Sequence, residues 1–337
     1  MIFPKFIKDN STIGITAPSD GISGKEKLYR LDSAINNFKR NGFNIKETQN
    51  VRNSKKGRSS SSKEQARQLE DLFKDDNVDA IICAGGGDFL LEMLSELDFH
   101  TIEKHPKWIQ GYSDPTGLLY TITTKLDIAT IYGDNFKAFG MNPWYKSLEN
   151  NLEILKGNII EQKNFDKYEK ERIEEIVGDE PYNLTEKVYW KNLNKEKNIL
   201  IKGRIIGGCI DILNDIFGTR FDNTKQFIEK YKKDGIVWYF DNCELTSEQL
   251  IRTLWKFKDN GWYKYTTGII FGRSGTNSSY YDISFEDAIR HSLKDLNIPI
   301  IIDTDIGHVS PRMTIINGAL VEIESKNGKG KIKFTLK

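Results

Sequence analysis

The chain is 337 residues long and almost electroneutral, with 49 lysines and arginines against 48 aspartates and glutamates. This balance excludes the basic surface that is typical of nucleic-acid-binding proteins, and the length is sufficient for two domains with their own cores. Hydrophobic residues make up 38% of the sequence, as in globular proteins, and no apolar run approaches the length of a transmembrane helix. We therefore expect a globular protein that binds neither nucleic acid nor membrane.

The N-terminus and the cysteines indicate the compartment. Residues 1–5 lack the apolar core and the cleavage site of a signal peptide. Three scattered cysteines, Cys83, Cys209 and Cys243, are too few for a disulfide framework or a zinc site. A cytoplasmic location is the default expectation.

Strands alternate with helices through the first half of the chain. Short apolar runs closed by turn residues predict the strands, and apolar residues at helical spacing predict the helices between them. Such alternation, with the loops of interest at the carboxyl ends of strands, favours a parallel, doubly wound sheet. The predicted strands are 12–17, 44–48, 80–84, 108–110 and 129–133, and the predicted helices are 25–40, 62–74, 89–97, the segment after Ser113, and 144–155.

The same alternation returns after a charged segment of little periodicity, 158–198, which we interpret as the connection between two domains. The domains are then 1–157 and 199–337. In the second domain the predicted strands are 199–209, 235–240, 268–272 and 298–302, and the predicted helices are 210–217, 247–260 and 284–296.

The turn around Ser113 lies between a predicted strand and a predicted helix. Gly111 permits backbone angles that other residues avoid, and Asp114-Pro115 is typical of an N-cap followed by the first helical position. Ser113 would then be an exposed nucleophile at the positive end of a helix, with the Asp114 amide directed at an oxyanion. The alternative is a serine that only caps the helix.

Two further loops of the first domain have a functional and a structural interpretation. Gly85-Gly86-Gly87-Asp88 follows a strand, so its amides could bind an anion, although a tight turn is the simpler interpretation. The loop 52–62, rich in serine, lysine and arginine, is expected to be solvated, with a substrate-recognition lid as the alternative.

His308, Asp241 and Glu244 also follow predicted strands. With Ser113 they occur in the order nucleophile, acid, base, which are the groups that nucleophilic acyl transfer requires. Asp303, Asp305 and His308 could instead supply metal ligands, but no fourth ligand is evident nearby. Of the other histidines, His100 and His105 are expected to flank a loop, and His291 is expected on a solvated helix face.

Several motifs match a known pattern. Residues 111–116, Gly-Tyr-Ser-Asp-Pro-Thr, match G-[YF]-S-D-x-T, and residues 307–311, Gly-His-Val-Ser-Pro, match G-H-x-x-P. Residues 12–19, 84–87 and 203–208 are similar to an opening strand with an Ala-Pro-Ser turn, a Gly-Gly turn and a G-R-x-x-G-G segment. In this order and over nearly the whole chain, the motifs resemble those of the LD-carboxypeptidase family of serine peptidases, which includes microcin C immunity peptidases.

The resemblance implies an α/β protein with an N-terminal doubly wound, mainly parallel sheet domain, a C-terminal α/β domain and an active site between them. Ser113 would attack the carbonyl, and His308 would transfer the proton. The amide of Asp114, with one from the turn of Gly86 and Gly87, would hold the oxyanion.

The identity of the acid is open. Family members end the second domain's 235–240 strand with a catalytic glutamate, and the equivalent position here is Asp241. The spacing to Arg252 supports that register. Glu244 is a nearby glutamate that could serve instead.

The family also implies a substrate, a cellular location and an oligomeric state. The bond cleaved would join an L-centre to the terminal D-residue of a murein tetrapeptide, in peptidoglycan recycling in the cytoplasm, by a homodimer that needs no metal or organic cofactor. One alternative is an immunity-type peptidase that cleaves a microcin C-like aminoacyl-nucleotide, and another is a non-hydrolytic ligand-binding homologue. Base stacking in the former could use Trp144, Tyr145, Trp190 and Trp238.

Overall fold

The fold is known from a computed structural model, which describes residues 1–170, 178–194 and 197–337. The chain divides into two compact units. The first comprises 1–160, the described part of 173–182, and 314–317, and the second comprises the described part of 161–172, 183–313 and 318–337. The division differs from the expected one because the chain passes between the units more than once.

In the described residues of the first unit, six strands form one sheet in the order β14-β5-β4-β3-β1-β2. All neighbours pair in parallel except β14, which is antiparallel to β5. Strand order reverses between β1 and β3, which is where ligands bind in doubly wound sheets. The strands are β1 (Thr12–Thr16), β2 (Asn44–Glu47), β3 (Ala80–Cys83), β4 (Trp108–Gly111), β5 (Thr130–Tyr132) and β14 (Ile315–Asn317).

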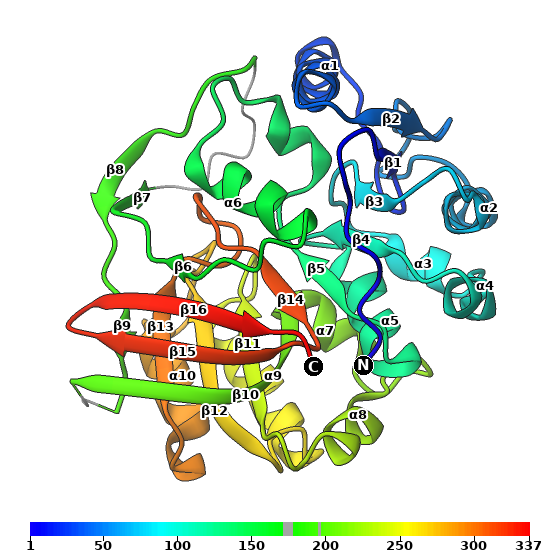
Figure 1. Ribbon diagram of the computed structural model, residues 1–337. Coiled ribbons are helices and arrows are strands. Elements are labelled where there is room, and N and C mark those ends of the chain that lie inside the picture. The colour runs from blue at the N-terminus through cyan, green and yellow to red at the C-terminus, as the bar shows by residue number, and fades with distance from the viewer. Residues whose placement is uncertain (171–177, 195–196) are drawn as a thin grey trace. The chain divides into compact units, whose positions relative to one another are not determined.

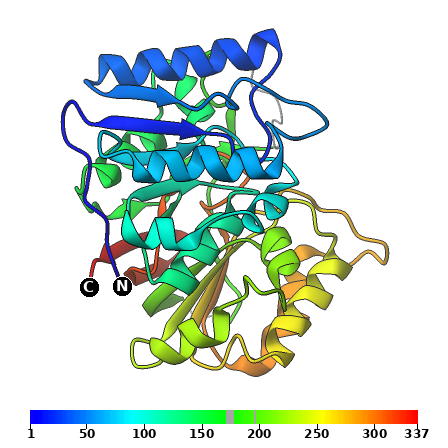
Figure 2. The same cartoon turned by 90° about the vertical axis from the view of Figure 1, so that its right-hand side faces the viewer.

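Helices cover both faces of this sheet. α2 to α5 pack against one another on one face, whereas α1, η1 and α6 lie on the other (Figure 1). α1 buries Leu31, Ala34 and Phe38, which lie on one stripe at helical spacing. α1 and α2 run alongside β2 and β1 (Figure 2). The bounds are α1 (Lys25–Arg40), α2 (Ser62–Lys74), α3 (Leu90–Leu94), α4 (Phe99–Lys104), α5 (Thr116–Leu126), η1 (Phe136–Gly140) and α6 (Lys146–Leu155).

The described part of the second unit has an eight-stranded sheet in the order β6-β16-β15-β10-β11-β12-β13-β9. Its middle strands, β10 to β13, are parallel, and the outer ones are antiparallel. β7 and β8 form a separate antiparallel pair. The strands are β6 (Gln162–Lys163), β7 (Lys167–Glu169), β8 (Leu184–Lys187), β9 (Lys191–Asn192), β10 (Asn198–Cys209), β11 (Ile236–Asp241), β12 (Thr266–Gly272), β13 (Ile300–Thr304), β15 (Leu320–Lys326) and β16 (Lys329–Thr335).

The parallel strands of this unit are connected by helices, of which α9 packs against α10. α9 begins with a capping box in which Thr246 and Gln249 bind each other's backbone N–H groups. The core beneath it is aromatic, with Trp238 stacked on Trp262, which stacks on Phe257. The bounds are α7 (Ile210–Ile216), α8 (Thr224–Lys230), α9 (Ser247–Asp259), α10 (Phe285–Leu293) and η2 (Lys294–Leu296).

Within the elements themselves, the structure also differs from the sequence-based expectation. The segment 158–198, where it is described, contains β6 to β9, and its residues 171–177 and 195–196 lie outside the described residues. The expected loop between His100 and His105 is α4, with His105 as its C-cap. The loop 52–62 is not wholly solvated, because the buried Ser59 hydroxyl donates to the carbonyl of Ala17 at 2.6 Å.

The carboxyl ends of the parallel strands bring the candidate residues together within each unit. Ser113 follows β4 in the first unit, and Asp241 ends β11 in the second, where Cys209 ends the neighbouring β10. None of the described helices is both long and apolar enough to cross a lipid bilayer.

Candidate active site

Ser113 occupies a sharp turn between β4 and α5. Its backbone has φ of 69°, in the left-handed region that residues other than glycine rarely adopt. Such a conformation costs on the order of 1–3 kcal/mol and concentrates at functional sites. A serine that only capped a helix would need no such strain, because an N-cap residue has ordinary extended angles. The residue is half-buried, not part of the closed core.

The glycine-rich turn after β3 lies directly against Ser113. A Cβ atom placed on Gly86 would approach both Cβ and Oγ of Ser113 to 3.2 Å, and the amide nitrogen of Asp114 to 3.9 Å. Any residue other than glycine would therefore crowd the serine hydroxyl. The next residue, Gly87, has φ of 150° and leaves no room for a Cβ beside Ser19.

The carboxylate of Asp114 holds the loops around this turn. Asp114 is buried, and its Oδ2 accepts hydrogen bonds from the Ser19 hydroxyl and, at 2.9 Å, from the backbone N–H of Leu90, the first residue of α3. The predicted N-cap role of Asp114 is therefore wrong. Helix α5 begins at Thr116 with Pro115 as its N-cap residue and no side-chain cap.

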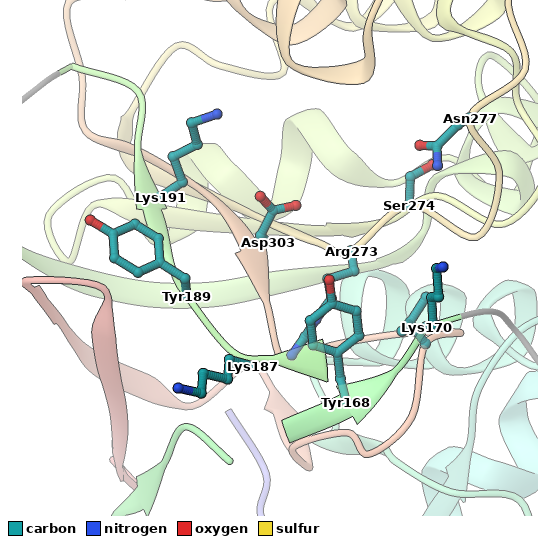
Figure 3. Close-up of a pocket in the computed structure, with 10 residues that line it drawn as sticks. Tyr168, Lys170, Lys187, Tyr189, Lys191, Arg273, Ser274, Asn277 and Asp303 are labelled. Atoms are coloured by element: carbon teal, nitrogen blue, oxygen red, sulfur yellow. The ribbon is translucent and has the colours of Figure 1, made fainter. Parts of the chain in front are cut away.

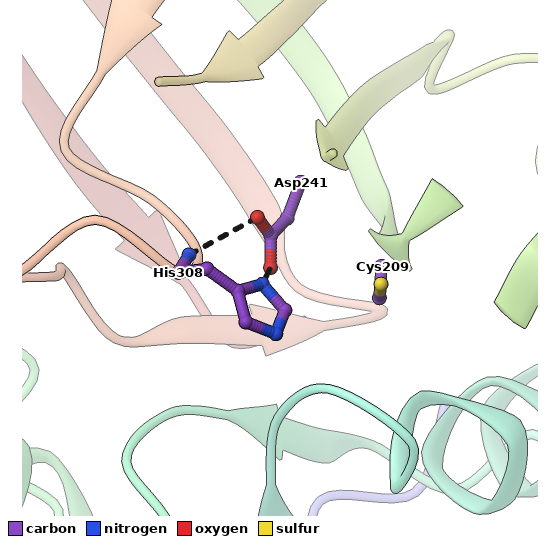
Figure 4. Close-up of side chains that lie close together, drawn as sticks. All are labelled: Cys209, Asp241 and His308. Carbon is purple, nitrogen blue, oxygen red and sulfur yellow. Dashed lines mark hydrogen bonds and ion pairs between the residues drawn. The ribbon is translucent and has the colours of Figure 1, made fainter. Parts of the chain in front are cut away.

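In the second unit, Asp241 and His308 form a close pair. The Nδ1 atom of His308 lies 2.7 Å from Asp241 Oδ2, and the backbone N–H of His308 donates to Oδ1 at 3.1 Å (Figure 4). Both residues are buried. Because the carboxylate binds the ring and the backbone of one residue, it fixes the orientation of the imidazole and directs its Nε2 away from the acid.

The loop before His308 is shaped to admit this carboxylate. Gly307 has φ of 90°, and a Cβ atom there would overlap the Asp241 carboxyl group. Arg312 holds the same loop, since its Nε donates to the Gly307 carbonyl at 2.6 Å. Glycine is thus required at 307 for both conformation and space.

Glu244, the other predicted acid, is placed differently. Its side chain is exposed, and its backbone N–H donates to Oδ1 of Asp211 at 2.9 Å. The Asp211 carboxylate also accepts the N–H groups of Cys243 at 3.0 Å and Leu245 at 3.1 Å. Asp211 therefore holds the turn after Asp241, and the structure brings Asp241, not Glu244, to the imidazole.

The alternative metal set of Asp303, Asp305 and His308 is not gathered in the described part of the chain. Both oxygens of Asp305 are already bound: Oδ1 pairs with Arg273, and Oδ2 accepts the indole N–H of Trp190 at 2.9 Å. Burial raises the pKa of Asp305 to about 6, although Arg273 opposes that shift. Asp305 is thus part of a buried structural ion pair.

A cavity of approximately 370 Å³ lies within the second unit, beside the carboxyl ends of β12 and β13. Figure 3 shows Asp303 in the middle of the surrounding side chains. Four cationic side chains line the cavity with this single acid, but two of them are paired with acids outside the lining, Arg273 with Asp305 and Lys191 with Glu286. Its lining residues are Tyr168, Lys170, Lys187, Tyr189, Lys191, Arg273, Ser274, Asn277, Asp303 and Val309.

The aromatic residues named for base stacking have structural contacts. Trp190 and Trp238 are fully buried. The Trp144 indole donates to the Phe139 carbonyl at 2.8 Å, and the ring of Tyr145 packs edge-on against Tyr182. Burial gives Trp190 and Trp238 a core role, whereas Trp144 and Tyr145 are partly exposed.

Three residues at these sites were missed at the sequence level: Ser19, Asp211 and Cys209. Ser19 follows the first predicted strand in the Ala-Pro-Ser turn, so its position at a strand end was a usable signal. Asp211 and Cys209 follow the glycines at the end of β10, next to the strand that ends in Asp241. That β10 lies next to β11 could be inferred only from the order of strands in the sheet.

Comparison with known families gives two matches, one for each half of the chain. Residues 13–133 match the LD-carboxypeptidase N-terminal domain, and residues 202–323 match the LD-carboxypeptidase C-terminal domain. Together the matches cover most of the chain. The first contains Ser113, and the second contains Asp241 and His308. The family resemblance seen in the motifs is confirmed.

Two relatives illustrate the activities that occur among similar proteins. A Bacillus subtilis protein provisionally named a murein peptide carboxypeptidase is 24% identical over 320 residues, which cover 94% of this chain and 89% of that protein. The microcin C7 self-immunity protein MccF of Escherichia coli is 25% identical over 329 residues, which cover 94% of this chain and 91% of that protein.

Solved structures share the fold. An MccF-like protein from Bacillus anthracis has a TM-score of 0.85 at 24% identity, with full coverage of both chains. The microcin C7 self-immunity protein MccF in complex with aspartyl sulfamoyl adenosine has a TM-score of 0.81 at 21% identity, again with full coverage. The expected two-domain α/β architecture is confirmed.

Proposed function

Since this chain belongs to the LD-carboxypeptidase family, we propose that it is a serine carboxypeptidase that removes the terminal D-residue from murein tetrapeptides. The observation on which this depends most is the left-handed backbone of Ser113, at a strand-to-helix turn with Gly86 against its hydroxyl. A strained backbone is expected where a sharp turn must expose a nucleophilic hydroxyl to a substrate.

In the proposed reaction, Ser113 Oγ attacks the scissile carbonyl and His308 accepts its proton. Asp241 binds Nδ1 of the imidazole, which leaves Nε2 to take that proton and later to give it to the leaving amine. The backbone N–H groups of Asp114 and of the Gly86-Gly87 turn would stabilise the oxyanion. The reaction needs no metal ion, and the acyl-enzyme is then hydrolysed by water.

The cellular part of the proposal follows from the family. A murein tetrapeptide carboxypeptidase would act in the cytoplasm during peptidoglycan recycling, as a homodimer. Mass measurement by light scattering on the purified protein tests the dimer: a monomer at micromolar concentration would contradict it.

The substrate is tested by comparing two compounds in one assay. A murein tetrapeptide should release its terminal D-amino acid, whereas an aminoacyl sulfamoyl adenosine should be cleaved far more slowly. Reversed preference would indicate the immunity-type activity that the likeness to MccF raises. The buried positions of Trp190 and Trp238 make them unsuitable for stacking a nucleobase, so of the four aromatic residues considered, the partly exposed Trp144 and Tyr145 are left for that activity.

The mechanism is tested by labelling with a fluorophosphonate and mapping the modified residue. An activated Ser113 should react, and Ser113→Ala should not. Hydrolysis should persist after exhaustive chelation, because no proposed step uses a metal. Without labelling or hydrolysis of either compound, the protein would be a non-hydrolytic homologue.

A further inference from the structure

Cys209, Asp241 and His308 come together in the second unit, and the proposed reaction uses only two of them. Each offers one metal-binding atom, and these three atoms all lie within 4.8 Å of one another. All three residues are buried. Figure 4 shows Cys209 beside the Asp241–His308 pair.

The convergence follows from the sheet. Cys209 is the last residue of β10 and Asp241 is the last residue of β11, and the two are directly paired in the parallel register. Residues paired across neighbouring strands point to the same face of a sheet. His308 comes from the loop after β13, where Gly307 allows it to approach the carboxylate. Three elements thus place a sulfur, an oxygen and a nitrogen ligand around one point.

These ligand types suit a thiophilic divalent cation. Zinc binds cysteine, histidine and aspartate at about 2.0–2.3 Å in tetrahedral geometry, which places ligand atoms roughly 3.4–3.6 Å apart. The His308–Asp241 contact of 2.7 Å would have to open by less than about 1 Å, and the sulfur of Cys209, which lies within 4.8 Å of the other two ligand atoms, would have to approach them by at most about 1.4 Å. Side-chain rotations produce shifts of that size. Three protein ligands leave a fourth position for water.

The surroundings of Cys209 select among cations. The Cys209 thiol donates to Oδ2 of Asp211 at 3.3 Å, so a cation must displace that proton to bind the sulfur. Soft, thiophilic ions do this far better than magnesium or calcium, which also require more oxygen ligands than this cluster offers. The buried Asp241 carboxylate adds a favourable negative charge.

We propose that Cys209, Asp241 and His308 form a binding site for a thiophilic divalent cation, with zinc as the preferred ion, and that its binding switches off hydrolysis. The cation takes the lone pair of one His308 ring nitrogen and replaces the Cys209 thiol proton, which passes to solvent. No group is oxidised or reduced. The inhibitory effect rests on the proposed function, because it requires His308 to be the base, but the binding itself does not.

Cobalt(II) serves as the probe for binding, because a cobalt–thiolate bond gives a charge-transfer absorption. Wild-type protein should develop this band and lose it on addition of zinc. Cys209→Ser should bind cobalt at least about tenfold more weakly, about 1.4 kcal/mol, and show no band. Cys83→Ser, which removes a buried cysteine of the other unit, should behave like wild type. An absent band in wild type, or an unchanged one in Cys209→Ser, would overturn the proposal.

Asp241→Asn provides a second test in case Cys209→Ser does not fold. It weakens an oxygen ligand while the thiol remains, so cobalt should still give the band but at higher concentration. Circular dichroism establishes that each variant is folded. A band that appears in Asp241→Asn at the wild-type cobalt concentration would remove Asp241 from the site.

Hydrolysis is measured in parallel. Zinc should inhibit the wild-type enzyme, EDTA should restore its activity, and Cys209→Ser should require at least about ten times more zinc for the same fractional inhibition. A cobalt band in a protein that hydrolyses no substrate would refute the proposed function and leave the metal site standing. A band in an active enzyme that zinc does not inhibit would refute the switch.

Discussion

Each unit has a buried aspartate beside its candidate catalytic residue, and the two aspartates have different partners. Asp114, next to Ser113, accepts hydrogen bonds from the Ser19 hydroxyl and from the Leu90 backbone. Asp241 instead accepts the backbone N–H of His308 and pairs with Nδ1 of its imidazole. The first carboxylate joins three loops, whereas the second orients one titratable ring. Substituting the first should mainly affect stability, and substituting the second should mainly affect catalysis.

The second unit also has a carboxylate of the first kind. Asp211 binds three successive backbone N–H groups, those of residues 243–245, and so holds the turn that follows Asp241. Asp211 lies in the first turn of α7, two residues after Cys209, which ends β10 and pairs with Asp241 at the end of the neighbouring β11. This makes Asp211 a matched comparison for Asp241 within one unit.

The largest effect is expected for Ser113→Ala. The nucleophilic oxygen is removed, so kcat should fall by about 10³-fold or more. Because the residue is half-buried and alanine relieves the strained backbone little, the melting temperature should change by only a few degrees. Steady-state kinetics and thermal unfolding measure both quantities. Full turnover by this variant would end the serine-peptidase interpretation.

Asp241→Asn should lower kcat by roughly 10²- to 10⁴-fold, because an asparagine can hold His308 in the wrong tautomer. Asp211→Asn is the matched control: it should reduce the free energy of unfolding by about 1–3 kcal/mol while kcat falls less than about tenfold. Kinetics and urea unfolding on both variants give the comparison. Equal losses of kcat would show that the two carboxylates do not differ as proposed.

Much of the fold could be predicted because the signals are local. Helix α1 has the predicted bounds, and β1 and β3 end within one residue of their predicted ends, since a buried stripe or a closed apolar run specifies each. The β15–β16 hairpin was missed although its signal is present: apolar residues alternate on both sides of Asn327-Gly328. This hairpin is therefore specified by local residues, like the helices.

Other features depend on distant partners and have no local signal. β6 and β9 are two-residue polar edge strands, which exist only because β16 and β13 offer free edges. β14 joins the first sheet from more than 180 residues beyond β5. At the candidate site, strand ends predicted Ser113, Asp241 and His308, but not which acid meets the imidazole. The carboxylate of Asp114 similarly binds Leu90, which no capping rule indicated.

A third type of carboxylate, one with a cationic partner, extends the comparison to pH. Burial raises the pKa of Asp305 from 3.8 to about 6, although Arg273 opposes the shift. The folded state therefore binds this proton more tightly than the unfolded state. The stabilisation of the folded protein that results from it is fully present below about pH 4 and is lost as the pH rises through 6. The difference in unfolding free energy between wild type and Asp305→Asn should fall over this window, by at most about 3 kcal/mol.

Urea unfolding of both proteins at pH 4 and pH 7 measures this difference. Asp305→Asn also leaves Arg273 without its carboxylate, so the variant should be less stable at every pH, and only the change with pH tests the titration. A difference that stays constant, or that rises with pH, would contradict the raised pKa.

Asp114→Ala should reduce the free energy of unfolding by about 1–3 kcal/mol, since the buried Leu90 N–H and the Ser19 hydroxyl lose their acceptor. Activity should fall through the altered position of Ser113, so the fluorophosphonate reaction should slow in the same proportion as kcat. Thermal unfolding and labelling rates provide the measurements. Unchanged stability with lost activity would give Asp114 a direct catalytic role and remove the contrast with Asp241.

The smallest effect is expected for Glu244→Gln. Glu244 has the side-chain type of the family's acid, but the residue is exposed and Asp211 holds its backbone. The Nδ1 atom of the imidazole instead lies 2.7 Å from Asp241 Oδ2. The change should therefore lower kcat by less than about tenfold, or about 1.4 kcal/mol in activation free energy. Measured beside Asp241→Asn under identical conditions, a large loss for Glu244→Gln and a small one for Asp241→Asn would transfer the role to Glu244. If neither substitution changed kcat, His308 would act without an orienting acid, and the proposed triad would be refuted.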